Sequence, residues 1–376
     1  MRIAFYAPLK PPDHPVPSGD RRVAQLFLAA LQMAGHDTQI ASRFRSYDRH
    51  GDPLRQARVA SVGARLAARF VRRCREAPQT APELWFTYHL YHKAPDWLGP
   101  QIADVLRIPY VIAEASDAPK QASRGWAAGR RAAERAIRLA DAVIGLNPAD
   151  RECVLPLLPD ARRWIAFKPF IDAAFYAGQA CVRAGPPRLL AVAMMRYGDK
   201  LASYQILGNA LSDLLDLPWS LEVIGDGPAR GAVEDALYPL QERVTWAGEI
   251  GPMEIARRLA SADLYVWPAL NEAFGMALLE AQASGVPVVA GAAGGVSEIV
   301  AHGVTGLLVP PCDARAFARA VRSLLVDRPR RAALAEAARH RVRTEHDISS
   351  AARRLNAVFD VVSPGKPSEI AGRRTS

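Results

Sequence analysis

Hydrophobic residues in this chain occur in short β-rich runs that alternate with longer segments of helical periodicity. This alternation is typical of parallel α/β architecture, in which helices connect buried strands. We expect two series of strands. The first comprises Arg2–Tyr6, Asp37–Ala41, Leu84–Thr87, Tyr110–Ala113 and Ala142–Gly145; the second comprises Arg188–Ala193, Ser220–Ile224, Val244–Ala247, Leu264–Val266, Val286–Ala290 and Gly306–Val309.

The two series predict an α/β protein of two Rossmann-like, doubly wound parallel-sheet domains that face each other across a cleft. A length of 376 residues suits two domains. We expect domains at residues 1–170 and 188–345, with a linker at 171–187 between them. A helix at 346–362 should follow, with packing against the first domain as one option, and residues 363–376 should form a disordered tail. The first strand should lead into a helix at about Arg22–Ala34, with Asp20 as N-cap and Gly35 as its stop.

Charge distinguishes the two halves of the chain. The net charge is +10. Residues 1–180 carry 26 basic and 17 acidic residues, a difference of +9, whereas residues 181–376 carry 22 and 21, a difference of +1. The basic half could attract nucleic acid, an anionic lipid surface or an acidic small molecule.

The arginine-rich segment Leu54–Arg75 shows helical periodicity, with Val59, Val62, Leu66 and Phe70 on one face. Two interpretations stay open: an interfacial helix on an anionic membrane surface, or an ordinary domain helix with a solvated basic face. Phe70 is its single aromatic residue, so the stacking platforms of nucleic-acid binders are lacking and we expect no nucleic-acid partner.

The start of the chain reads as a buried strand and not as a signal peptide, and no apolar run approaches the roughly 18–20 residues of a membrane-spanning helix. The four scattered cysteines suit a reducing compartment. We therefore expect a cytoplasmic protein, with peripheral attachment to the inner face of the membrane as an open alternative.

The segment from Tyr265 to Ala290 carries the clearest chemistry. A strand ends at Pro268, a loop carries Glu272, and a helix that contains Glu280 begins near Gly275. Amides at such a helix start can bind an anion or hydroxyl oxygens, and carboxylates accept hydrogen bonds from vicinal sugar hydroxyls. Alternatively, Glu272 only complements the helix dipole and Glu280 is a solvated helix residue.

This segment, with its neighbours, resembles the family-4 (group 1) retaining glycosyltransferases, which have the GT-B fold. Glu272 and Glu280 match the Glu-x7-Glu motif of that family. Further matching segments lie in order around it, namely Leu221–Pro228, Val244–Ile250, Gly294–Val300 and Gly303–Asp313. The resemblance is strong over residues 188–325 and weak over residues 1–150.

The resemblance implies a nucleotide-diphosphate sugar as donor, bound by the second domain, and a hydroxyl acceptor on the first. It implies a contact from Glu272 to the transferred sugar, with the amides of Phe274, Gly275 and Met276 beside it, and a contact from Glu280 to the ribose. Arg196 and Lys200 resemble the pair that neutralises the donor diphosphate. The donor-binding set further includes Gly225, in the glycine turn after a strand, and Gly19, whose backbone is expected near the donor phosphates.

The family's usual His-Asp pair is absent after Tyr110–Ala113, where this chain has Glu114 followed by Ala-Ser-Asp. No general base can be named. The acceptor-side candidates are His89, Glu114, Ser116 and Lys120, and a lipid-linked saccharide or a cell-envelope glycan is a reasonable acceptor by analogy.

The sequence contains no Asp-x-Asp and no His/Cys cluster, so we expect a metal-independent enzyme without a resident cofactor. The competing hypothesis is a protein that binds a nucleotide sugar without catalysis.

Overall fold

The computed structural model describes residues 1–16, 18–121, 125–177 and 185–363. It divides into two units, one of Met1–Phe167 with the chain from Ser349 onward, and one of Lys168–Ile348. Residues 178–184 of the expected linker and residues 364–376 of the expected tail lie outside the described residues.

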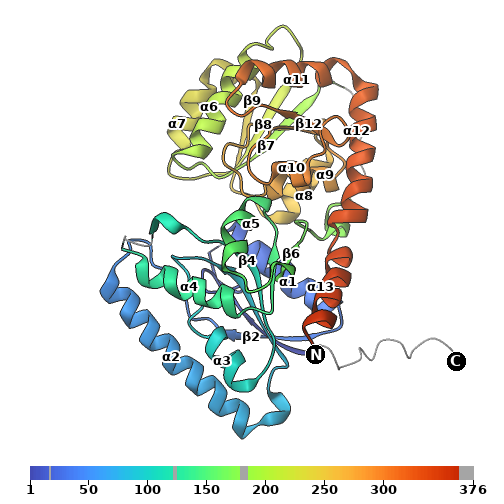
Figure 1. Cartoon of the computed structure of the whole chain (residues 1–376). Coiled ribbons are helices and arrows are strands. Elements are labelled where there is room, and N and C mark those ends of the chain that lie inside the picture. Colours follow the sequence, from blue (N-terminus) through green and yellow to red (C-terminus); the bar gives the residue numbers. More distant parts are fainter. Residues whose placement is uncertain (17, 122–124, 178–184, 364–376) are drawn as a thin grey trace, which may run out of the picture. The chain divides into compact units, whose positions relative to one another are not determined.

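The first unit is built on a six-stranded parallel sheet with the order β2-β1-β3-β4-β5-β6 (Figure 1). Its strands are β1 (Arg2–Tyr6), β2 (Asp37–Ser42), β3 (Leu84–Leu90), β4 (Tyr110–Ala115), β5 (Ala142–Gly145) and β6 (Trp164–Ala166). Its α-helices are α1 (Gly19–Met33), α2 (Pro53–Glu76), α3 (Gly99–Leu106), α4 (Ala127–Leu139), α5 (Pro148–Val154) and α13 (Ile348–Val362). The sequence prediction missed β6, a strand of three residues that are not fully buried.

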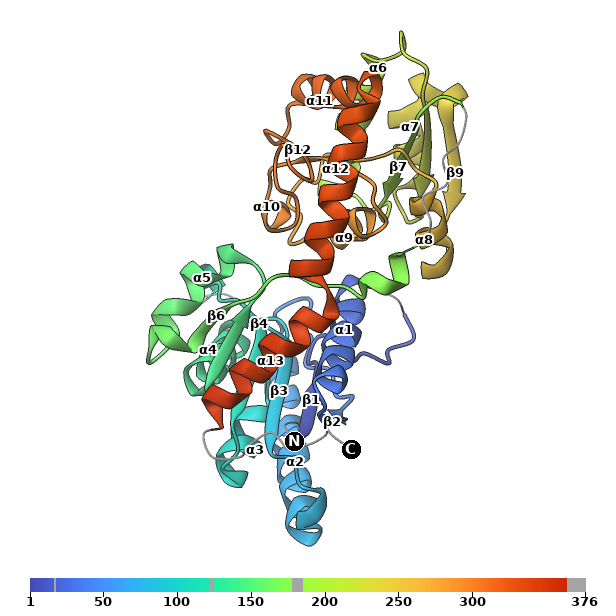
Figure 2. The ribbon, with the colours of Figure 1, turned by 90° about the vertical axis from the view of Figure 1, so that its right-hand side faces the viewer.

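Aromatic side chains join both helical layers to this sheet. On one face Phe86 of β3 contacts Phe27 of α1 and Phe359 of α13, with ring centroids 5.6 and 6.3 Å apart. Figure 2 shows α1 and α13 on this same side of the sheet. On the other face Phe70 of α2 packs edge-on against Trp85, 5.4 Å away. Both faces are therefore covered, as parallel sheets require.

The second unit contains a six-stranded parallel sheet of order β12-β11-β10-β7-β8-β9. Its strands are β7 (Arg188–Val192), β8 (Ser220–Ile224), β9 (Val244–Gly248), β10 (Leu264–Trp267), β11 (Val288–Gly291) and β12 (Gly306–Val309). Its α-helices are α6 (Asp199–Ser212), α7 (Arg230–Leu237), α8 (Pro252–Ala260), α9 (Met276–Ala283), α10 (Val296–Ile299), α11 (Ala314–Val326) and α12 (Arg328–Arg341). All predicted strands of the second series are present, with ends that differ by at most two residues.

One local sequence prediction, the N-cap of the first helix, was wrong. Helix α1 begins at Gly19, and its N-cap is Ser18, whose side chain accepts a hydrogen bond from the Arg21 amide; Asp20 pairs elsewhere. In α2 the buried stripe comprises Gln56, Gly63, Ala67, Phe70, Val71 and Cys74, whereas Val59, Val62 and Leu66 are only partly buried.

This stripe packs inside the first unit, where a side chain added at Gly63 would lie 2.5 Å from Trp97 Cβ. The apolar face of α2 is therefore not available to lipid, and only its arginine face is exposed. No described helix is long and apolar enough to cross a membrane.

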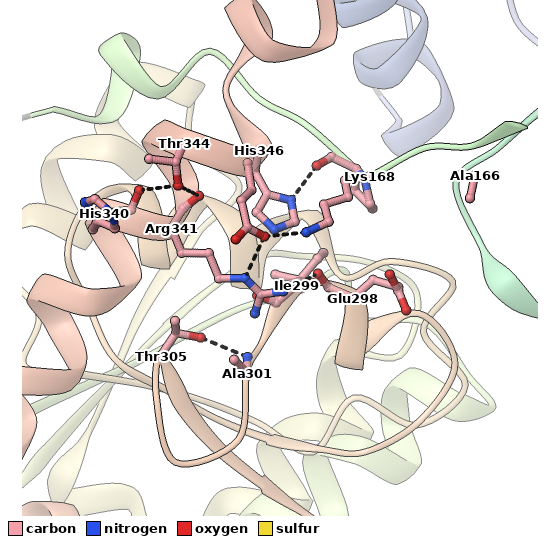
Figure 3. A network of polar contacts seen from close by, with 12 residues as sticks. Ala166, Lys168, Glu298, Ile299, Ala301, Thr305, His340, Arg341, Thr344 and His346 are labelled. Carbon is pink, nitrogen blue, oxygen red and sulfur yellow. Dashed lines mark hydrogen bonds and ion pairs between the residues drawn. The ribbon is translucent and has the colours of Figure 1, made fainter. Parts of the chain in front are cut away.

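The chain passes between the units twice, and the second unit anchors both passages through one polar network (Figure 3). After α12 a π-helical turn, Val342–His346, leads to His346, whose Nδ1 lies 2.7 Å from the carbonyl oxygen of Pro169. Glu345 pairs with Lys168 and, at 3.2 Å, with Arg341. Two backbone hydrogen bonds of 2.9 Å link Ile171 to His346 and to Ile348. Segments 177 positions apart are thus held together.

Acidification should weaken this network. Burial lowers the pKa of His346 to about 4, against an ordinary value of 6.5. Between about pH 4 and pH 6.5 the imidazole of His346 is protonated in the unfolded chain but neutral in the folded chain. The free energy of unfolding should therefore fall as the pH drops from about 6.5 towards 4. We expect the fall to be smaller by roughly 1–3 kcal/mol in His346→Asn, which cannot titrate but retains an N–H donor for Pro169. Urea unfolding across this range measures it.

The exposed His340→Asn provides the matched control and should follow the wild-type profile. Equal pH profiles for wild type and His346→Asn would contradict a buried, neutral imidazole.

Candidate functional site

The strand order of the second unit marks where a ligand site belongs. Strands β7 and β10 are neighbours, while β8 and β9 extend the sheet on one side and β11 and β12 on the other. This is a topological switch point, and ligands of open α/β sheets bind outside the carboxyl ends of the strands there. The loops after β7 and β10 carry Arg196 and Glu272, and Lys200 lies in the first turn of α6, which follows the loop after β7.

Glu272 and Lys200 form an ion pair at this point. The side chains are 17% and 27% exposed, so both groups remain accessible from solvent. Trp267, the last residue of β10, donates from Nε1 to Glu272 at 3.1 Å, and its ring lies 5.4 Å from the Lys200 ammonium. Tyr204 supports Trp267 in turn through an edge-on contact at 4.9 Å. A carboxylate and an ammonium group are thus positioned by one indole.

The loop after β10 is held in an uncommon backbone conformation. Ala269 and Asn271 have positive φ angles of 55° and 51°. Asn271 donates to Asp199 at 3.0 Å, and the Leu270 amide donates to Ser203 at 3.2 Å. Non-glycine residues of this kind are uncommon and concentrate at functional sites.

Two glycines allow the next loop to approach this one. A side chain at Gly294 would lie 2.0 Å from the carbonyl oxygen of Glu272, and one at Gly295 would lie 2.2 Å from that of Ala273. The Gly295 amide donates to Ala273 at 3.0 Å. The glycine pair, which belongs to a motif that the sequence analysis recognised, therefore fixes the backbone on which Glu272 is mounted.

Helix α9 begins directly after this loop. Gly275 is its N-cap with φ 72°, a conformation that favours glycine. Within the described residues, the amides of Phe274, Gly275 and Met276 donate no hydrogen bond to the protein. Glu280 lies one turn along α9. Burial raises the pKa of Tyr265 above its usual value, and the charges of Glu272 and Glu280 contribute to the same shift. Both carboxylates therefore act on one phenol.

Two further donor-side candidates, Arg196 and Gly225, lie at the same edge of the sheet, but neither is recorded in contact with Glu272. The Arg196 side chain is exposed and has no ion-pair partner within the described part of the chain. Gly225 follows β8 with φ 141°, and a side chain there would meet the carbonyl oxygen of Ala193 at 1.9 Å. The need for glycine at 225 is therefore explained by packing of the loops after β7 and β8.

In the first unit, the acceptor-side candidates His89 and Glu114 end adjacent strands β3 and β4. Both have positive φ angles, 58° and 61°. His89 Nδ1 lies 2.9 Å from Asp20 at the start of α1. Gly19 precedes this aspartate, and a side chain at 19 would meet no atom within 4 Å, so nothing in the fold itself requires glycine there.

Charges in this cluster perturb one another. Burial raises the pKa of Glu114 to about 7, although His89 and a hydrogen bond from Tyr88 oppose the shift. Burial also raises the pKa of Asp150, at the start of α5, to about 6. The pKa of His89 is raised because interactions with Asp20 and Glu114 outweigh burial.

The remaining candidates, Ser116 and Lys120, make no side-chain contact with this cluster that is recorded among the described residues. Ser116 is partly buried, and its amide donates to Leu90 at 3.1 Å. Lys120 is exposed in the short helix Pro119–Gln121, with no side-chain partner among the described residues.

Sequence reasoning missed Trp267, Asn271, Asp20 and Asp150 as site residues. The last three are polar residues just beyond predicted strands or at helix starts, and this signal could have found them. Within the described residues no group of three or more His, Cys, Asp or Glu side chains could hold a metal ion.

Residues 198–341 match the family model described as glycosyl transferases group 1. The second unit therefore contains a group 1 glycosyl transferase domain. Trp267, Glu272 and Lys200 all lie within the matched residues, as do the glycine pair and α9.

Curated relatives of this group 1 chain include the D-inositol 3-phosphate glycosyltransferase of Nocardia farcinica, which is 31% identical over 67% of this chain and 62% of its own length. The sulfoquinovosyl transferase SQD2 of Arabidopsis thaliana is 32% identical over 41% of this chain and 30% of its own. The chain spans between 21% and 62% of the curated relatives it matches.

Solved structures resemble the chain over both units. Sucrose-phosphate synthase from Thermosynechococcus elongatus has a TM-score of 0.70 at 22% identity, covering 96% of this chain and 98% of its own. Anabaena HepE in complex with UDP has a TM-score of 0.72 at 18% identity, covering 96% and 100%. The expected α/β class and GT-B fold are thereby confirmed.

The perturbed carboxyl of Glu114 gives a stability test. Between its ordinary value of 4.5 and about 7 the folded chain keeps a proton that the unfolded chain has lost, so Glu114 lowers stability as pH rises through this window. We expect Glu114→Gln, which cannot ionise, to gain roughly 1–3 kcal/mol in free energy of unfolding relative to wild type over that window. Denaturant titrations of both proteins measure it.

Asp104→Asn, on the exposed side of α3, is the control and should run parallel to wild type. A constant difference between Glu114→Gln and wild type at all pH values would refute the raised pKa.

Proposed function

We propose that this protein transfers a sugar from a nucleotide-diphosphate sugar to a hydroxyl acceptor, with retention of anomeric configuration and without a metal ion. The observation that carries the proposal is the Lys200–Glu272 pair, fixed by Trp267 at the switch point of the second sheet. The family match over residues 198–341 supports it. Among the structural neighbours, HepE forms complexes with UDP and with UDP-glucose.

In this proposal each group has a distinct task. The bond from the anomeric carbon to the donor phosphate breaks with its electrons moving to the diphosphate, and Arg196 and Lys200 stabilise the developing charge. Glu272 accepts hydrogen bonds from hydroxyls of the transferred sugar, so donor binding separates it from Lys200. The amides at the start of α9 add donors, and Glu280 contacts the ribose. The acceptor oxygen forms the new bond, and its proton passes to the departing phosphate.

Gly19 would approach the donor phosphates in this reaction, and the loop after β8, with Gly225, would flank the nucleotide. The acceptor would bind the first unit near His89 and Glu114, with Ser116 and Lys120 as outer candidates. A lipid-linked saccharide or a cell-envelope glycan fits a basic first unit by analogy. The alternative is a protein that binds the nucleotide sugar without catalysis.

Replacement of Glu272 separates these alternatives. We expect Glu272→Ala to reduce sugar transfer at least about 100-fold, because the interaction matters most in the transition state. The exposed Glu336→Ala on α12 is a matched carboxylate deletion and should retain transfer. Acceptor-dependent release of nucleotide measures activity, and unchanged melting confirms folding. Full activity of Glu272→Ala would remove Glu272 from the site.

Nucleotide binding is tested separately by thermal shift with UDP, GDP, ADP and their sugars, with and without EDTA. A ligand at about 100 times its dissociation constant stabilises the folded chain by roughly 2.7 kcal/mol. We expect a selective shift that EDTA does not alter. A shift without transfer to any acceptor favours the non-catalytic alternative, and no shift with any nucleotide would refute the donor site.

We further propose that the arginine face of α2 rests on an anionic membrane surface. Its arginines are all exposed, at 55, 58, 65, 69, 72, 73 and 75, and exposed Arg131, Arg135 and Arg138 of the neighbouring α4 add to the charge. Arg69 and Arg73 line a depression of about 240 Å³, whose two guanidinium groups suit the phosphate group of a lipid.

Charge reversal of Arg65, Arg69 and Arg72 to Glu should reduce sedimentation with phosphatidylglycerol-containing vesicles by at least about tenfold, since each basic residue near such a surface contributes about 1 kcal/mol. Reversal of Arg315 and Arg319, exposed on α11 of the second unit, is the control. If the α2 variant sediments with vesicles as much as the wild type does, the membrane contact is refuted and α2 is an ordinary domain helix with a solvated basic face.

A further inference from the structure

The carboxyl end of the first sheet carries a compact set of ionisable and aromatic side chains. Asp20 comes from the start of α1, Tyr88 and His89 from the end of β3, Glu114 from the end of β4 and Asp150 from the start of α5. Strands β1 and β3 are neighbours, with β2 outside one and β4 outside the other, so this set lies at the switch point of its own sheet. We call it the β3–β4 cluster.

Hydrogen bonding within the β3–β4 cluster is incomplete. His89 is oriented by Asp20 at 2.9 Å, and Tyr88 donates to Glu114. The second carboxyl oxygen of Glu114, Oε2, is buried and has no hydrogen-bond partner within the described residues. A buried carboxylate oxygen without a donor is costly, so this atom is prepared to accept a hydrogen bond from a ligand.

The charge of the cluster is negative. Burial opposes ionisation of Asp20, but the hydrogen bond and charge of His89, a backbone hydrogen bond and the charge of Lys10 together outweigh burial and lower its pKa, so Asp20 is ionised near neutral pH. Asp150, with a pKa of about 6, adds negative charge at neutral pH, whereas Glu114, with a pKa of about 7, is only partly ionised there. His89, whose pKa is raised by its acidic neighbours, offsets part of this charge. A further anion would have to enter against these carboxylates.

Three cations of the first unit, Lys10, Arg130 and Lys93, are engaged by other groups. Lys10 acts on Asp20 itself. Arg130 is held by both oxygens of Asp117, at 2.9 Å each, and by Glu134 at 2.6 Å. Lys93 lies 4.8 Å above the ring of Trp126. A phosphate at the cluster would find no uncommitted cation among these.

Aromatic rings extend from the cluster along the chain. Tyr91 lies 5.3 Å from His89, His92 lies 5.3 Å from Tyr91, and Trp126 lies 5.9 Å from His92. Flat apolar rings beside carboxylates match the two surfaces of a sugar or cyclitol, namely its C–H faces and its hydroxyl edge.

From these contacts we propose that the β3–β4 cluster receives the acceptor as an uncharged polyhydroxyl ring and discriminates against a ring phosphorylated at that position. The inference rests on the proposed function and specifies its acceptor. The hydroxyl groups of a ring donate hydrogen bonds to Glu114 Oε2 and to Asp20 or Asp150. A phosphate group offers only oxygen acceptors to these carboxyl oxygens, and its negative charge is repelled by the ionised carboxylates. The carboxylates of the cluster therefore select against the phosphorylated ring.

Saturation-transfer NMR on the full chain tests this with paired probes: glucose and glucose 6-phosphate, and myo-inositol and myo-inositol 3-phosphate. We expect at least one neutral probe to bind, and its phosphorylated counterpart to bind at least about tenfold more weakly. Glu114→Gln and, independently, Asp20→Asn should weaken the neutral probe and narrow the difference. Asp104→Asn on α3 should change neither.

Equal or tighter binding of the phosphorylated probe, no binding of any neutral probe, or no effect of either cluster variant would each overturn the inference. Melting temperatures of both variants show whether they fold, and either one alone suffices. The nucleotide thermal shift on the same samples reports the donor site separately. A nucleotide shift with no polyol binding therefore rejects this inference alone, whereas a missing nucleotide shift rejects the proposed function.

Discussion

Parallel strands end at one edge of a sheet, and most of the chemistry in this protein follows from that constraint. Each unit has one pair of neighbouring strands from which the sheet extends in opposite directions, β7 and β10 in the second unit and β1 and β3 in the first. Because the crossover helices leave in opposite senses there, the loops diverge and a ligand can reach the strand ends. The Lys200–Glu272 pair occupies one such edge and the His89–Asp20 pair the other.

Loop backbone geometry then determines where the functional groups lie. Glu272 is mounted on a loop with two non-glycine residues at positive φ, and that loop is supported from below by Gly294 and Gly295. His89 and Glu114 have positive φ at the ends of adjacent strands. Such conformations cost of the order of 1–3 kcal/mol each, and the surrounding packing has to supply that energy.

The two edges differ in charge in a way that suits different ligands. The donor-side edge exposes Arg196 and Lys200 beside unpaired helix amides, an arrangement that favours an anion. The β3–β4 cluster presents carboxylates whose pKa values are raised by burial, an arrangement that favours hydroxyl donors. The polar network around His346 has another task, which is to hold the two chain passages to the second unit.

The sequence by itself determined the fold class, eleven of the strands and the residues of the donor-side motif, because hydrophobic periodicity and glycine positions are local properties of the chain. It could not find β6, which is short and only partly buried, since its pairing with β5 is made by tertiary contact. Nor could the sequence decide whether Asp20 caps the first helix or pairs with His89. A helix cap depends on neighbouring residues, whereas the pairing joins residues 69 positions apart. The tertiary structure alone decided that Trp267 orients Glu272, that the apolar face of α2 is covered, and that Glu114 is buried enough to hold its proton near neutral pH. Burial and long-range pairing depend on which segments meet, and only the folded chain establishes that.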